Sequence, residues 1–146
     1  MFSKILVPVD FASYTGHILR YATEIATRFG SSLHLIHVIP NMDYFGPYES
    51  FMAAGTIMTV QKGVEVEVRK NLEEVAGRVT GIGVTQAIRT GTAFVEIISY
   101  VEDQGIDLVV MGTHGRGRID HILLGSVAEK VVRRSPCPVL TIRPPA

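Results

Sequence analysis

The sequence predicts an α/β domain in which a doubly wound, five-stranded parallel sheet carries helices on both faces. Five short segments are apolar and rich in β-branched residues without polar alternation, as in strands covered on both faces. Between them lie segments whose apolar residues recur at helical spacing, so the strands are joined by right-handed crossovers. A length of 146 residues suits one domain, and we expect residues 1–146 to form it.

The first strand is expected at residues 5–9, an unbroken apolar run. Residues 12–29 predict a helix that ends at Gly30, because apolar residues recur at steps of four, three and four: Ile18, Ala22, Ile25 and Phe29. Residues 33–39 predict the second strand. Its two histidines, His34 and His37, are three residues apart, so they should point to opposite faces and form no metal-binding pair.

Residues 40–54 are punctuated by Gly and Pro and have no sustained period, which predicts a loop. This loop contains Met42, Met52 and four of the eleven aromatic residues of the chain: Tyr44, Phe45, Tyr48 and Phe51. Such a cluster could cover a bound ligand, contact a second subunit, or fold back onto its own core.

A long helix is expected next, closed by Gly81 and Gly83, because its apolar residues are spaced by three or four: Ile57, Val60, Val64, Val68, Leu72, Val75 and Val79. Residues 84–89 predict a more polar strand at or near a sheet edge. The following helix should end at Gly105, and its apolar residues are Phe94, Val95, Ile98 and Val101.

The fourth strand is expected at residues 107–111, and a glycine-rich stretch at 112–125 separates it from the last helix. That helix uses Val127, Val131 and Val132 as its apolar residues. Residues 138–142 predict the last strand. Cys137 stands between two prolines just before it and is expected to be a buried structural thiol.

Composition and charge exclude several classes of protein. Lys plus Arg and Asp plus Glu both total 14, so no global field attracts nucleic acid or an anionic membrane. No run approaches the roughly 18 apolar residues of a membrane span, and the start of the chain lacks a signal peptide. A single cysteine forms no internal disulfide. We therefore expect a soluble protein of the cytoplasm.

Chemistry is expected at the carboxyl ends of the strands, where ligands bind in open α/β sheets. Asp10 ends the first strand, Val38 lies near the end of the second, and the glycine-rich stretch leaves the fourth. Its glycines allow close approach to a bulky anion, and the amides at the helix start at Gly125 and Ser126 favour negative charge. Asp10 and Ser126 could each instead cap a helix.

Positive charge is concentrated near the same stretch. Residues 112–146 have a surplus of four positive charges, with Asp120 and Glu129 set against Arg116, Arg118, Lys130, Arg133, Arg134 and Arg143. This local surplus suits an anionic ligand. The basic residues of the last helix could equally complement its carboxyl end.

Four segments of the chain, residues 4–10, 111–116, 126–131 and 135–140, resemble the universal stress protein family. The spacing G-x2-G-x9-G-[S/T], which marks the ATP-binding branch of that family, is met by Gly112, Gly115, Gly125 and Ser126. The resemblance covers nearly the whole chain.

The resemblance implies a Rossmann-like sheet of order 3-2-1-4-5 that binds ATP between strands one and four. It places Pro8, Val9, Val38 and Met111 around the adenine and assigns the ribose to the Asp10 carboxylate and the Gly112 backbone. The triphosphate would be lined by Gly115, Arg116, Gly125, Ser126 and Val127, with Mg or Mn held mainly by the phosphates. A single histidine in a polar loop, such as His114, is expected to be a solvated or phosphate-contacting donor rather than a proton shuttle. Some relatives have a hydroxyl residue where this chain has Ala128.

The resemblance also implies a homodimer paired through the last strand and a role as a nucleotide-dependent regulatory module in a stress response. One alternative is an enzyme that hydrolyses ATP slowly or transfers part of it, with His114, Arg116 or Arg118 recruited to the reaction. No Walker A loop and no G-x-S-x-G elbow are present, so turnover should be slow and no catalytic residue is assigned. The other alternative is a nucleotide-free dimeric scaffold.

Overall fold

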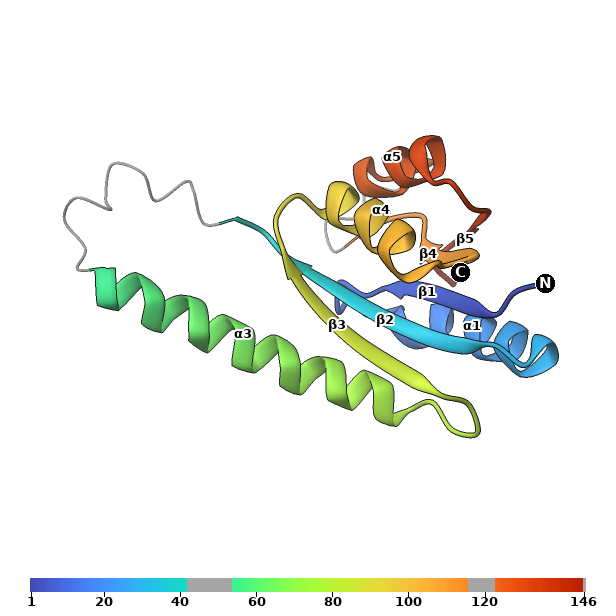
Figure 1. Cartoon of the computed structure of the whole chain (residues 1–146), viewed down its shortest axis with the longest axis horizontal. Helices are drawn as coiled ribbons and strands as arrows, with labels where there is room; N and C mark the ends of the chain where they lie inside the picture. The colour runs from blue at the N-terminus through green and yellow to red at the C-terminus, as the bar shows by residue number, and fades with distance from the viewer. Residues whose placement is uncertain (42–53, 116–122, 146) are drawn as a thin grey trace.

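A computed structural model of the chain describes residues 1–41, 54–115 and 123–145, without the side chains of residues 54–57. Its five strands are all parallel and form one sheet in the order β3-β2-β1-β4-β5, as expected (Figure 1). The strands are β1 (Lys4–Pro8), β2 (Ser32–Ile39), β3 (Val84–Thr90), β4 (Leu108–Gly112) and β5 (Val139–Ile142). The more polar β3 lies at an edge, which confirms that prediction.

Helices cover both faces of this sheet, so the doubly wound architecture is confirmed (Figure 1). In the described part of the chain they are α1 (Thr15–Phe29), α3 (Ala54–Gly77), α4 (Ala93–Gln104) and α5 (Ser126–Arg134). α1 and α3 pack on one face of the sheet, whereas α4 and α5 pack on the other.

The two faces explain why β1 reads as an unbroken apolar run. Ile5 and Val7 point into the core beneath α1 and α3, where Leu72 is fully buried. Leu6 points the other way, into the core beneath α4 and α5 with Val131. Because neighbouring residues of a strand point to opposite faces, a strand covered on both sides has no solvent-facing position for a polar side chain.

Two helices end where the sequence predicts. Gly30 (φ 68°) and Gly105 (φ 66°) adopt the left-handed conformation, and their N–H groups donate to the carbonyls of Ala26 and Val101. Glycine adopts this conformation without the steric penalty of a Cβ.

α3 is longer than the sheet it covers. Its first half extends past the ends of the strands (Figure 1), and Met58 and Val60 are exposed there. Its second half supplies the buried residues Val68 and Leu72, together with Val75. The stripe predicted from residue 57 onward therefore forms a core-facing surface only in its second half.

Two sequence predictions concern residues outside the described ranges. One is the role of the aromatic loop at 40–54, of which residues 42–53 are not described, and the other is the position of Arg116 and Arg118. A third prediction is corrected, because Cys137 is half-buried rather than buried, with its Sγ 3.4 Å from the Ser135 hydroxyl. No helix among the described residues has the length and apolar character needed to cross a bilayer.

The two histidines of β2 point to opposite faces, as expected. The Nδ1 atom of His34 lies 2.8 Å from the Tyr100 hydroxyl beneath α4. The Nδ1 atom of His37 instead donates to the Val9 carbonyl oxygen at 2.6 Å. In the described residues no three His, Cys, Asp or Glu side chains converge as a metal site.

We expect the protein to lose stability in mild acid through His34. Burial, reinforced by the charge of Lys4, lowers the pKa of His34 below its ordinary value of 6.5. Below about pH 6.5 the unfolded chain therefore binds more protons at this residue than the folded chain. The free energy of unfolding then decreases as the pH is lowered. Urea unfolding at pH 7.5 and pH 5 measures this loss. His34→Gln should lose less stability over that interval than the wild type, and equal losses would contradict the role of His34.

Candidate functional site

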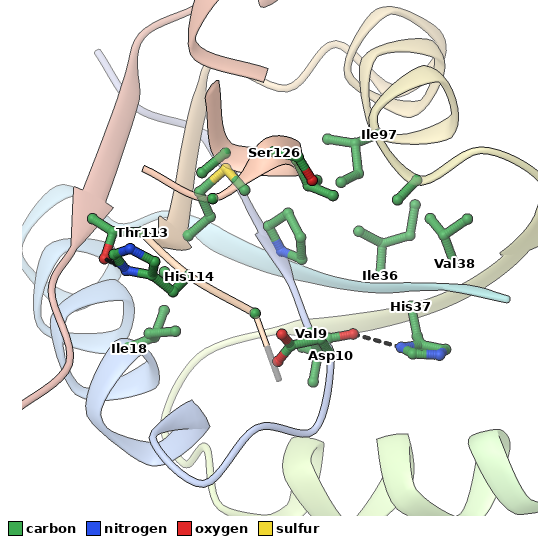
Figure 2. Close-up of a pocket in the computed structure, with 18 residues that line it drawn as sticks. Val9, Asp10, Ile18, Ile36, His37, Val38, Ile97, Thr113, His114 and Ser126 are labelled. Atoms are coloured by element: carbon green, nitrogen blue, oxygen red, sulfur yellow. Dashed lines mark hydrogen bonds between the residues drawn. The ribbon is translucent and has the colours of Figure 1, made fainter. Parts of the chain in front are cut away.

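A cavity of about 480 Å³ opens at the carboxyl edge of the sheet, between β1 and β4 (Figure 2). This volume lies within the roughly 300 to 1,000 Å³ typical of small-molecule sites. It brings together eleven of the twelve residues expected there: Pro8, Val9, Asp10, Val38, Met111, Gly112, His114, Gly115, Gly125, Ser126 and Val127. The twelfth, Arg116, is outside the described residues.

Asp10 follows β1 directly and reaches the cavity through a tight turn. Its Oδ1 atom accepts the N–H of Ala12 at 3.0 Å, and Phe11 between them has a left-handed φ of 61°. α1 begins only at Thr15, so the alternative that Asp10 caps this helix is wrong. A Cβ on Gly115 would lie 3.0 Å from Asp10 Oδ2, so the carboxylate faces the glycine-rich segment closely.

His37 and Phe11 pack against each other at this turn and stabilise it. Their rings stack with centroids 4.7 Å apart, while His37 holds the Val9 carbonyl as described above. His37 also lines the cavity but was not among the expected site residues. Its position next to Val38 on β2 is the feature of the sequence that could have identified it as a site residue.

The segment after β4 is fixed to two neighbouring elements. The N–H of Thr113 donates to the Ile142 carbonyl of β5 at 3.0 Å, and the N–H of Gly125 donates to the Thr113 carbonyl at 2.6 Å. Gly125 is the N-cap of α5, with an ordinary φ of −67°. Glycine is required here because the backbone of residue 125 lies close to that of Thr113. A Cβ on Gly125 would be 3.2 Å from the Thr113 carbonyl oxygen.

The N-terminus of α5 therefore opens into the cavity. Ser126 is the first residue of the helix and Gly125 is its N-cap, so the capping alternative for Ser126 is also wrong. The first N–H groups of a helix have no partner within it and carry partial positive charge. Ser126, Val127 and Ala128 all line the cavity, which suits an anion at this end.

The basic side chains of α5 do not line the described cavity, and Arg133 and Arg134 lie in the last turn of the helix, as in the alternative that they complement its carboxyl end. Lys130 and Arg134 lie over the Phe94 ring, at 4.9 and 5.3 Å from its centroid. Arg133 pairs with Glu129 at 3.1 Å. Lys and Arg are absent from the described lining, where main-chain amides are the groups that favour an anion.

The opposite part of the cavity is apolar. Ile36, Val38 and Ile97 project from β2 and α4 on one side, away from Thr113 and His114 (Figure 2). Sequence reasoning found Val38 but missed its same-face neighbour Ile36, two residues earlier on the strand. It also missed Ala93 and Ile97, because only the packing of α4 across the sheet edge brings them in.

The family model described as the universal stress protein family matches residues 1–143. This chain belongs to the universal stress protein family. The universal stress protein MJ0531 of Methanocaldococcus jannaschii is 30% identical over 148 residues, covering 99% of this chain and 84% of the relative.

Solved structures of other universal stress proteins share the fold. The structure of protein MJ0577, from the same archaeon, has a TM-score of 0.86 at 29% identity and covers 100% of this chain and 99% of its own. A universal stress protein from Archaeoglobus fulgidus, solved in complex with dAMP, has a TM-score of 0.68 at 20% identity, with 97% of this chain and 98% of its own covered. At that identity the likeness extends to the fold alone.

Proposed function

We propose that this universal stress protein binds ATP in the cavity at the sheet edge and acts as a nucleotide-dependent regulatory module in the cytoplasm. Residues 1–146 would form one nucleotide-binding domain. The observation that supports ATP most directly is the convergence on one cavity of a carboxylate, an apolar wall and a helix N-terminus whose N-cap is a glycine.

The chemistry of the cavity divides among the three parts of the ligand. Pro8, Val9, Val38 and Met111 would border the adenine, since apolar walls suit a flat heterocycle. The Asp10 carboxylate would accept hydrogen bonds from the ribose hydroxyls, beside the Gly112 backbone. The phosphates would meet Gly115, Gly125, Ser126 and Val127, together with His114 and Arg116.

A divalent ion would accompany the triphosphate. Asp10 provides the one carboxylate in the described lining, so Mg²⁺ or Mn²⁺ would be held mainly by phosphate oxygens. The ion would screen phosphate charge from the nearby carboxylate. The nucleotide in the Archaeoglobus fulgidus structure supports the proposal by showing that this fold accommodates one.

We further propose a homodimer paired through β5. This strand lies at the sheet edge, and Leu140 on it is 37% exposed. An apolar edge strand leaves main-chain groups unpaired unless another strand covers them. Light scattering should give twice the chain mass of 16.0 kDa, whereas a monomer at micromolar concentration would refute the dimer.

Calorimetric titration of the purified protein with Mg-ATP tests the binding proposal. We expect saturable heat with one ATP per chain, whereas the absence of saturation would leave the protein as a nucleotide-free scaffold. Phosphate release should be far slower than the roughly 1 to 10³ per second of ordinary enzymes. Release within that range would replace the regulatory module with an enzyme.

A further inference from the structure

Tyr14 places a buried hydroxyl against the segment that follows β4. The residue precedes α1, and only 8% of its surface is exposed. Its hydroxyl donates to the main-chain carbonyl oxygen of His114 and accepts the main-chain N–H of the same residue, with N to O at 3.1 Å. One side chain thus satisfies both main-chain groups of a residue 100 positions away.

The same tyrosine explains why residue 112 is glycine. A Cβ on Gly112 would lie 2.6 Å from the Tyr14 hydroxyl oxygen and 2.9 Å from its Cε2. Real Cβ atoms do not approach other atoms this closely, so a side chain at 112 would displace Tyr14. Gly112 has no positive φ, which leaves close packing against Tyr14 and Ile18, whose Cδ1 would lie 2.9 Å from the same Cβ, as the reason for glycine there.

Tyr14 is the third anchor of this segment. Thr113 is held by β5 and by the N-terminus of α5, through Ile142 and Gly125. Tyr14 adds α1 and fixes His114, the residue directly before Gly115. The N–H of His114 already donates to the Tyr14 hydroxyl. We therefore expect Gly115 to be the first residue after it whose main-chain N–H is available to a ligand.

We propose that Tyr14 is a positioning residue that holds His114 so that Gly115 meets the phosphates of a bound nucleotide. This inference rests on the proposed function and goes beyond it, since Tyr14 does not line the cavity. The anchor acts on the phosphate part of the site.

Tyr14→Phe tests the proposal because it keeps the ring against Gly112 and removes only the hydroxyl. We expect ATP affinity, measured by calorimetry, to fall about tenfold, which corresponds to the loss of one or two hydrogen bonds. Adenosine, which lacks phosphates, should change by less than about twofold. Unchanged ATP affinity, or an equal loss for both ligands, would overturn the proposal.

Tyr100→Phe is the matched control. Tyr100 is also buried, and its hydroxyl pairs with His34 under α4, away from the cavity. This variant should lose stability without the selective loss of ATP. If Tyr100→Phe also lost ATP affinity selectively, removal of any buried hydroxyl would weaken ATP binding. That result would overturn the role given to Tyr14.

Hydrogen exchange of the ligand-free protein judges the anchor independently of nucleotide. In the wild type the amide of His114 should exchange at least about tenfold more slowly than that of exposed Gly115, because it is hydrogen-bonded to a buried group. Equal exchange would overturn the proposal even if Tyr14→Phe did not fold. Failure of the wild type to bind ATP would instead refute the proposed function, while this measurement still decides whether the anchor exists.

Discussion

Gly125→Val is expected to reduce ATP affinity by about a hundredfold, which corresponds to about 3 kcal/mol. The φ of −67° at Gly125 is open to valine, so the backbone itself is not strained. The obstruction is spatial, since the first added carbon would lie 3.2 Å from the Thr113 oxygen and 3.4 Å from the His114 Cα. The N-terminus of α5 must then move away from the segment after β4, and the two groups of amides no longer converge on one anion.

Calorimetry with Mg-ATP measures this loss, and Gly83→Val serves as the control. Gly83 lies before β3, and a Cβ there would meet only the Ser32 Cβ at 4.0 Å, an ordinary contact. Circular dichroism should show that both variants are folded. In the calorimetric titration, Gly125→Ala should have an ATP affinity between those of the wild type and Gly125→Val. If Gly125→Val bound ATP as well as Gly83→Val, α5 would have no part in holding phosphate.

The sheet and its covering helices could be predicted because their signals are local. The uninterrupted apolar run of β1 and the glycines that end α1 and α4 each follow from a few neighbouring residues. The order of the strands followed from the family resemblance. The extent of burial along α3 could not be predicted, because helical spacing shows which face is apolar but not how far the sheet beneath it reaches.

The candidate site was predictable where it depends on the ends of strands and on glycine spacing. Asp10, Val38 and Gly125 line one cavity for that reason. The contribution of Tyr14 could not be predicted, since no motif marks a tyrosine that contacts a residue 100 positions later. The basic residues of α5 misled for a similar reason, because charge counted along the chain does not show that Lys130 and Arg134 lie over Phe94.

Asp10→Asn is expected to weaken ATP binding by about tenfold through the ribose. A hydrogen bond to a charged acceptor contributes about 1.5 to 3 kcal/mol, and the amide is a weaker acceptor for ribose hydroxyls. Asparagine retains an oxygen that can accept the Ala12 N–H, so the turn after β1 is preserved. The variant thus separates the charge of Asp10 from its role in the turn.

The ribose contact and the general electrostatics of Asp10 have opposite signs, so a second ligand distinguishes them. Removing a negative charge near the phosphates favours a polyphosphate, whereas removing the hydroxyl acceptor disfavours only a ligand with hydroxyls. The 2′,3′-dideoxy form of ATP should therefore bind Asp10→Asn as well as the wild type, or more tightly. An equal loss for ATP and its dideoxy form would show that Asp10 shapes the cavity without binding the sugar, because a true contact requires the partner hydroxyls to be present.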